Sequence, residues 1–232
     1  PYLIIADPKD MNFVMNHPSC LRKSNFYDFM RNWLGNGLLT SDGDRWWKHR
    51  KIITPAFHFQ ILDEFIDVFN SQSEILVSIL KEKNKNANID VYPYIGRCTL
   101  DIICETAMGT TVNAQRDIGS EYVRCLHLLL DIFFIRFFSP ILSNNFLYKF
   151  SRTYRNEKNA LKVVHGYTKS VIQRRKQELF RSIRNNEEIG GSLGRKKRRA
   201  FLDLLLEYSM TDSQFTEEHI REEVDTFMFE RV

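Results

Sequence analysis

The sequence has 232 residues, of which 43% are hydrophobic and 27% are charged, and its formal net charge is +4. These values are ordinary for globular proteins and argue against a disordered or collagen-like chain. The chain has 10 glycines and 6 prolines, whereas average usage would give roughly 28 of the two together. This shortage of turn-forming residues argues against a sandwich or barrel of many short strands. We therefore expect a mainly α protein, and at about 150 residues per domain the length fits one large domain or one and a half.

The predicted elements in chain order are mostly helices. A short β-type run at 2–6 precedes a short helix at 8–15 and an irregular segment at 16–40. Helices are then predicted at 45–54, from 59 to about 80, from about 93 to 108, at 120–138, 154–181 and 200–208, and from 216 onward. Polar loops are predicted at 81–88 and 185–199. Because no repeat or low-complexity tract separates these elements, we predict one helical body.

The most apolar run of the chain, 126–142, is not predicted to span a membrane. It contains His127, Asp131, Arg136 and Pro140, whereas a spanning helix needs about 20 mostly apolar residues. We expect it to be a core helix or a surface segment that dips into lipid.

Four cysteines lie far apart in the sequence: Cys20, Cys98, Cys104 and Cys125. No C-x-x-C pair or Cys/His cluster is present, so neither a disulfide scaffold nor a zinc site is indicated. We predict that all four are buried structural thiols in a reducing environment.

The segment 43–51 carries the first candidate site. Trp46 and Arg50 are four residues apart, so on a helix they share one face. An indole N–H and a guanidinium that point the same way can hold an anionic group such as a carboxylate. On spacing alone, the solvated side of an amphipathic helix is the alternative.

Five strings resemble one known family. G-D-R-W-W-K-H-R-K-I-I-T-P-A-F-H-F at 43–59 is similar to the third-helix signature of the cytochromes P450, specifically the family-four branch of fatty-acid hydroxylases and insect enzymes. W-L-G-N-G-L-L-T at 33–40, R-C-T-L-D-I-I-C-E-T-A-M-G at 97–109 and R-A-F-L-D-L-L-L-E at 199–207 agree with it in the same order. I-R-E-E-V-D-T-F-M-F-E at 220–230 resembles the opening of that branch's long central helix.

The resemblance implies roles for three residues in binding haem. Trp46 and Arg50 match the W-x-x-x-R positions whose side chains bind the haem propionates. Glu230 matches a glutamate that can form an ester with a haem methyl group, while a solvated glutamate near the C-terminus is the alternative. After Glu230 the family continues with glycine and then His/Asp-Thr-Thr, whereas this sequence reads Arg231-Val232. We expect this ending not to belong to the family's helix.

The resemblance also implies that the iron ligand is missing. The family supplies it as a cysteine thiolate in a C-terminal F-x-x-G-x-R-x-C-x-G loop, and none of the four cysteines has that context. The E-x-x-R pair of a later helix is missing too. We therefore expect residues 1–232 to be a partial cytochrome P450 domain without the N-terminal anchor or the haem-thiolate region, with no metal ligand and no activity alone.

The full enzyme implied by the resemblance is a haem monooxygenase. It would insert one oxygen atom of O₂ into a hydrophobic substrate such as a fatty acid, with electrons from NADPH through a reductase, at the endoplasmic reticulum membrane. A helical interaction protein without catalysis is the second hypothesis. The third, a nucleic-acid-binding module, rests on the basic run 194–199, which we predict instead to be a solvated loop, because no aromatic platform accompanies it.

Overall fold

The computed structural model describes residues 4–20, 22–63, 65–83, 88–117, 119–188 and 200–229. The N-terminal elements are α1 (Pro8–Asn16), the 3-10 turns η1 (Pro18–Cys20) and η2 (Asn25–Met30), and α2 (Arg31–Leu34). The central elements are α3 (Gly43–Ile53), η3 (Thr54–Phe57), α4 (Phe59–Asp63), α5 (Ile66–Lys83), α6 (Tyr92–Thr106) and α7 (Glu121–Phe138). The remaining elements are α8 (Asn145–Tyr148), α9 (Arg152–Glu188), α10 (Phe201–Thr211) and α11 (Glu217–Phe229).

The predicted mainly α class is confirmed. The helix predicted at 120–138 is α7, and the helix predicted from about 93 is α6, with Pro93 in its first turn. The segment 16–40, predicted to be irregular, contains η1, η2 and α2 instead.

The predicted N-terminal strand is not seen where the structure describes the chain. Residues 4–7 have no regular secondary structure, and residues 1–3 lie outside the described part. A strand is defined by its pairing with a neighbour, and no described segment offers one to residues 4–7. Of the predicted loop at 185–199, residues 185–188 belong to α9 and residues 189–199 lie outside the described part.

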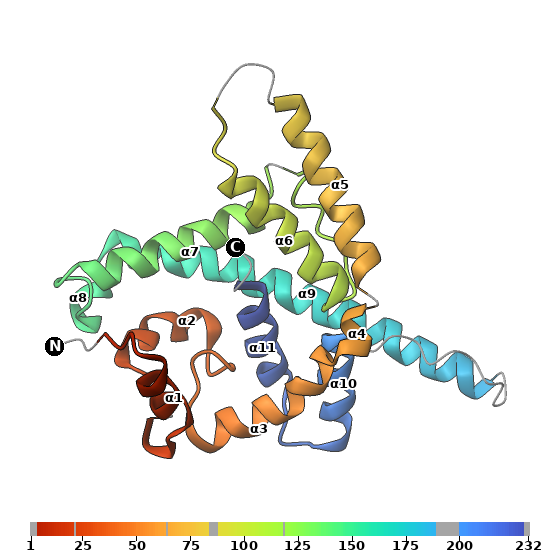
Figure 1. Cartoon of the computed structure of the whole chain (residues 1–232), viewed down its shortest axis with the longest axis horizontal. Coiled ribbons are helices and arrows are strands. Elements are labelled where there is room, and N and C mark those ends of the chain that lie inside the picture. The colour runs from red at the N-terminus through yellow and green to blue at the C-terminus, as the bar shows by residue number, and fades with distance from the viewer. Residues whose placement is uncertain are drawn as a thin grey trace.

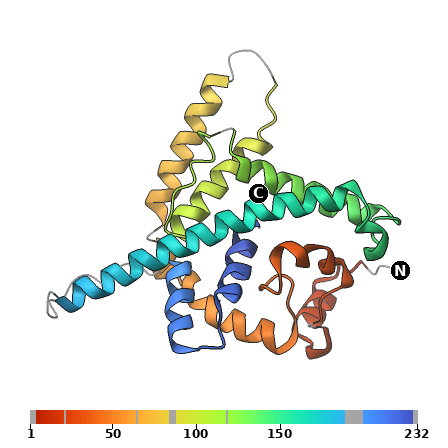
Figure 2. The same ribbon diagram turned by 180° about the vertical axis from the view of Figure 1, so that it is seen from behind.

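The helices form one body around α9 and α11. The long α9 runs beside α7, and α5 leans on α6 at one edge of the molecule (Figures 1 and 2). The short α11 lies between α9, α10 and α2 (Figure 1). Its apolar stripe is fully buried, with Ile220 and Val224 at 0% exposure and Met228 at 1%.

The opposite side of α11 is buried as well. Glu223 is 0% exposed, Asp225 and Thr226 are 1% exposed, and Glu222 is 6% exposed. Buried charges are costly unless they are paired and hydrogen-bonded, so each of these carboxylates must have partners on neighbouring elements. Those partners determine how the candidate site is held.

Candidate functional site

The helix α3 brings Trp46 and Arg50 together, as their spacing predicts. The Arg50 guanidinium lies 5.2 Å from the centre of the Trp46 ring, a cation–π contact. Arg50 is exposed and Trp46 is half-buried. Within the described part of the chain, the Arg50 guanidinium has no carboxylate partner. Its charge is therefore available to an anion.

An adjacent face of α3 is fixed to α11 by a partly exposed ion pair between Arg45 and Glu222 and by a buried contact between His49 and Glu223. Arg45 Nη2 lies 2.6 Å from Glu222 Oε2, and His49 Nδ1 lies 2.6 Å from Glu223 Oε1. The side chains of His49 and Glu223 are 4% and 0% exposed. These contacts fix the orientation of α3 about its own axis, and with it the direction of the adjacent face that carries Trp46 and Arg50.

The same two glutamates hold the loop at 35–40. Glu222 Oε1 accepts the Asn36 amide N–H at 2.9 Å, and Glu223 Oε2 accepts the Leu38 amide N–H at 3.0 Å. Each carboxylate thus contacts a side chain of α3 through one oxygen and a backbone amide of the loop through the other. We call Glu222 and Glu223 the carboxylate clamp.

Two glycines let the loop approach the clamp. Gly35 has φ +56°, and a Cβ added there would lie 2.1 Å from Glu222 Oε1. A Cβ at Gly37 would lie 2.6 Å from the Glu222 carbonyl oxygen. Such contacts are closer than any non-bonded carbon and oxygen atoms allow, so the W-L-G-N-G-L-L-T string has its glycines where the loop meets α11.

A second buried cluster joins α11 to α9. Asp225 accepts hydrogen bonds from Thr168 Oγ1 at 2.6 Å and from Arg221 Nη1, and His165 Nε2 lies 3.6 Å from its second oxygen. His165 Nε2 also lies 2.9 Å from the Trp33 carbonyl oxygen. Burial raises the pKa of Asp225 to about 7, although the bonds from Thr168 and Arg221 act in the opposite direction.

We expect Asp225→Asn to change the pH dependence of stability. The pKa of Asp225 is about 7 in the folded protein and about 4 in an unfolded chain. The folded state therefore keeps this proton up to a higher pH than the unfolded state does. Its contribution to stability is therefore fully present below about pH 4 and is lost as the pH rises to about 7. The asparagine amide of the variant has no such titration. Urea unfolding at several pH values should therefore show that the stability of the variant rises relative to that of the natural chain between about pH 4 and about pH 7.

The matched control for this prediction is Asp63→Asn, because Asp63 is exposed at the end of α4. A free-energy difference between the Asp225 variant and the natural chain that stays constant from about pH 4 to about pH 7 would contradict the prediction.

Two buried polar atoms near the clamp have no hydrogen-bond partner in the described part of the chain: Trp33 Nε1 and Ser41 Oγ. The Trp33 ring packs edge-on against Phe229, with 5.1 Å between ring centres. Phe229 is the last described residue of α11. Buried donors without partners are rare and point to an additional polar group, so this end of α11 fits a polar cofactor nearby.

Three of the four cysteines are buried thiols, as predicted, whereas Cys20 is exposed. Burial raises the pKa of Cys98, Cys104 and Cys125. A thiol must lose its proton to ligate a metal, so these three are unsuited to that role. Among the described residues, no group of three His, Cys, Asp or Glu side chains could hold a metal ion.

A family model described as Cytochrome P450 matches residues 1–232. The chain belongs to the cytochrome P450 family. It is 43% identical over 230 residues to cytochrome P450 4c21 of Blattella germanica, covering 99% of this chain and 46% of that protein. It is 40% identical over 237 residues to cytochrome P450 4c3 of Drosophila melanogaster, covering 99% of this chain and 44% of that protein. It is also 40% identical over 238 residues to human cytochrome P450 4V2, again covering 99% and 44%.

These relatives confirm the predicted family-four branch. The chain spans less than half the length of each of them. The haem-binding roles predicted for Trp46 and Arg50 stay predictions, although the two side chains do share a face of α3. Glu230 and the departure at Arg231-Val232 lie outside the described residues.

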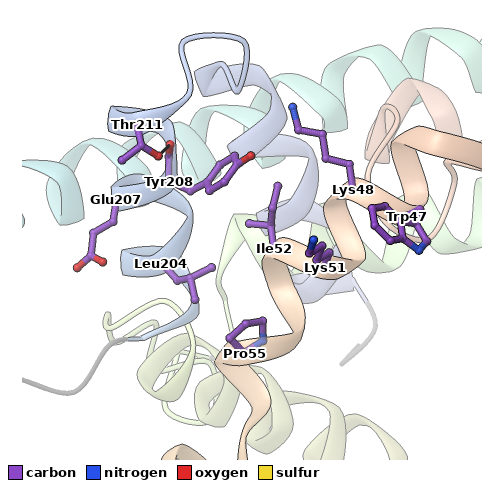
Figure 3. Close-up of a pocket in the computed structure, with 9 residues that line it drawn as sticks. All are labelled: Trp47, Lys48, Lys51, Ile52, Pro55, Leu204, Glu207, Tyr208 and Thr211. Carbon is purple, nitrogen blue, oxygen red and sulfur yellow. Dashed lines mark hydrogen bonds between the residues drawn. The ribbon is translucent and has the colours of Figure 1, made fainter.

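Trp47, the neighbour of Trp46 on α3, lines a groove on the surface of this cytochrome P450 chain. It is 60% exposed and lies at the mouth of this groove, which has a volume of about 640 Å³ and lies between α3 and α10 (Figure 3). Ile52, Pro55 and Leu204 give this groove an apolar floor. Lys51 Nζ lies 5.2 Å from the centre of the Trp47 ring. Trp47 and Lys51 line this groove, whereas Trp46 and Arg50 do not.

No helix in the described part of the chain is both long enough and apolar enough to cross a bilayer. Within the run 126–142, α7 ends at Phe138 and Arg136 is buried.

Proposed function

We propose that these 232 residues belong to a haem-dependent monooxygenase that inserts one oxygen atom of O₂ into a hydrophobic substrate. The family to which the chain belongs supports the class of reaction. The observation that carries the proposal is the exposed Arg50 guanidinium on the Trp46 ring, on a helix that the carboxylate clamp holds in one orientation. The substrate class that we propose is a fatty acid or a similar lipid.

The bound haem would supply the activation of O₂. Arg50 and the Trp46 indole N–H would donate to its propionates, because a guanidinium binds carboxylates through paired, charge-assisted hydrogen bonds. The clamp supports this role because it binds Arg45 and His49 on the adjacent face of α3 and so fixes the orientation of the helix. Glu230 would form the ester with a haem methyl group. Its predecessor Phe229 packs on Trp33, whose N–H has no partner in the described part of the chain.

The proximal thiolate, in this proposal, comes from a cysteine outside these 232 residues. The buried Cys98, Cys104 and Cys125 have raised pKa values, which is opposite to what a thiolate ligand requires. We therefore expect residues 1–232 alone to be inactive. The complete protein would take electrons from NADPH through a cytochrome reductase and would be located at the endoplasmic reticulum membrane.

The alternative is a helical interaction protein that derives from such an enzyme. No specific contact of the described residues favours it. The basic run 194–199, on which the nucleic-acid hypothesis depended, lies outside the described residues.

The proposal is tested by haem reconstitution and CO-difference spectra. We expect a thiolate-type band from the natural protein that contains residues 1–232, and none from residues 1–232 alone. In the natural protein, Arg50→Gln should speed the transfer of haem to a competing apoprotein by about tenfold or more, because one charge-assisted bond is lost.

The matched control is Lys51→Gln, which removes the same charge from the next residue of α3, on the side of the groove in Figure 3. Haem transfer should be unchanged in this variant. A thiolate-type band from residues 1–232 alone, or equal haem loss from both variants, would contradict the proposal.

A further inference from the structure

His219 lies in the first turn of α11, next to α3 (Figures 1 and 2). It is half-buried, and its ring packs against that of His49, with 5.5 Å between the ring centres. It is not one of the residues to which a role in binding haem was assigned. It does contact Arg45, the side chain that joins α3 to the carboxylate clamp.

Arg45 connects three parts of the molecule through one guanidinium. Its Nη2 lies 2.6 Å from Glu222 Oε2, its Nε donates to the Asn36 carbonyl oxygen at 2.9 Å, and its Nη1 lies 3.3 Å from His219 Nε2. Each nitrogen of the guanidinium thus faces a different acceptor. The contact with His219 fixes the side of the guanidinium that is not held by the clamp or by the loop.

The contact between Arg45 and His219 requires a neutral ring with its acceptor at Nε2. A guanidinium can only donate hydrogen bonds. The Thr216 amide N–H approaches the other ring nitrogen, Nδ1, at 3.3 Å, but a neutral imidazole has only one acceptor nitrogen. Because Thr216 is exposed, its amide can bind water instead. We therefore place the acceptor on Nε2 of His219 and the proton on Nδ1.

The charged and titratable groups that face His219 come from α3 and α11. Within the described part of the chain they are Arg45, Lys48 and His49 on α3 and Glu222 on α11. Burial is the main cause that lowers the pKa of His219 below its usual value, and the charge of Arg45 lowers it further. The ring is therefore neutral at about pH 7, the state that the contact with Arg45 requires.

A proton on Nε2 of His219 would reverse the nature of this contact. Two positively charged groups would then face each other across 3.3 Å, and like charges at this distance repel. Glu222 follows His219 by three residues on α11, so the two side chains are neighbours on one face of the helix. The protonated ring would therefore compete with Arg45 for the same carboxylate.

We propose that His219 is a positioning residue for α3, which holds Arg45 on Glu222 while its ring is neutral and releases Arg45 when the ring is protonated. Of its two contacts with the clamp, α3 then keeps the one between His49 and Glu223. The helix turns more freely about its axis, and the adjacent face with Arg50 loses its fixed direction. The effect on haem rests on the proposed function, whereas the release of α3 does not.

The first experiment measures amide hydrogen exchange of residues 47–53 in the natural protein that contains residues 1–232, as protection relative to the intrinsic rate at each pH. We expect protection to fall about tenfold between about pH 7.5 and about pH 5, because a charge-assisted hydrogen bond is lost. His219→Gln keeps an acceptor and does not titrate, so its protection should stay high. The matched control His127→Gln, at a half-buried histidine of α7, should keep the fall.

An Arg45→Gln background shows whether the effect passes through the guanidinium. Without that cation, a protonated ring at position 219 has nothing to repel and no competitor for Glu222. In this background, His219→Gln should therefore change protection by less than about twofold at either pH. An equal fall in the natural protein and the His219→Gln variant, or an equal effect of His219→Gln in both backgrounds, would overturn the proposal.

Transfer of haem to a competing apoprotein separates this inference from the proposed function. At about pH 5 the natural protein should lose haem about threefold faster than the His219→Gln variant, and at about pH 7.5 the two rates should be equal. If His219 controls the protection of α3 but the transfer rates agree at both pH values, the positioning role stands and the role of Arg50 toward haem is wrong. If protection does not depend on His219, the inference is wrong whatever the transfer rates are.

Discussion

We expect Gly35→Ala to lower the free energy of unfolding by about 3–5 kcal/mol, because it combines backbone strain with a clash. Gly35 has φ +56°, where a Cβ is unfavourable, and that Cβ would lie 2.1 Å from Glu222 Oε1 and 2.6 Å from its Cδ. Relief of the clash requires the Glu222 side chain to leave the Asn36 amide and the Arg45 guanidinium. Urea unfolding followed by circular dichroism measures the loss.

Two other glycines separate strain from clash. Gly43 has φ +55° with open space around the added Cβ, so Gly43→Ala should cost only about 1–2 kcal/mol. A Cβ at Gly37 would lie 2.4 Å from Thr226 Oγ1 and 2.6 Å from the Glu222 carbonyl oxygen, so Gly37→Ala reports the clash. Its cost should be about 2–3 kcal/mol. If Gly35→Ala cost no more than Gly43→Ala, the loop would not be held against the clamp as described.

Periodicity predicted the helices well where their apolar stripe faces the core. The predicted helix 120–138 differs from α7 by a single residue at its start, because Leu126, Leu129 and Phe133 are buried at helical spacing. α9 is longer than predicted, from Arg152 to Glu188. Beyond the predicted end at residue 181, the sequence S-I-R-N-N-E-E has one apolar residue, so it offers no apolar period that would predict the extension.

Only the part of the candidate site that depends on the spacing of residues along one helix was predicted from the sequence. Trp46 and Arg50 share a face because they are four residues apart on one helix. The clamp could not be predicted in this way, because Glu222 and the Asn36 amide are 186 positions apart in sequence. The one local signal was two adjacent carboxylates in α11, and a charged side chain on an amphipathic helix is ordinarily taken as solvated.

That rule fails for α11 because neighbouring elements cover both of its sides. The apolar stripe that contains Ile220 and Val224 predicts one buried face, and the polar face is then expected to meet solvent. Instead α9, α10 and α2 surround the helix. The loop amides and side chains of α3 replace water as partners of the carboxylates, as the Leu38 amide and His49 do at Glu223.

We expect Glu223→Ala to lower the free energy of unfolding by about 3–5 kcal/mol, because two buried polar groups, His49 Nδ1 and the Leu38 amide, lose their partner. The Glu223 side chain is fully buried. Its Oε1 lies 2.6 Å from His49 Nδ1, and its Oε2 accepts the Leu38 amide N–H at 3.0 Å. Alanine leaves His49 Nδ1 and the Leu38 amide in the interior without the carboxylate that they contact in the natural chain. His49 also packs against Phe215 and His219. Neither of these side chains has a carboxylate that could replace that of Glu223. Urea unfolding curves measure the loss.

Two variants show whether the loss comes from the clamp. Glu223→Gln keeps one carbonyl oxygen as an acceptor, so its cost should be intermediate, at about 1–3 kcal/mol. Glu74→Ala removes an exposed glutamate from the middle of α5 and should change stability by less than about 0.5 kcal/mol. A loss from Glu223→Ala as small as that from Glu74→Ala would mean that His49 and the Leu38 amide have other acceptors. The orientation of α3, and with it the direction of Arg50, would then not depend on α11.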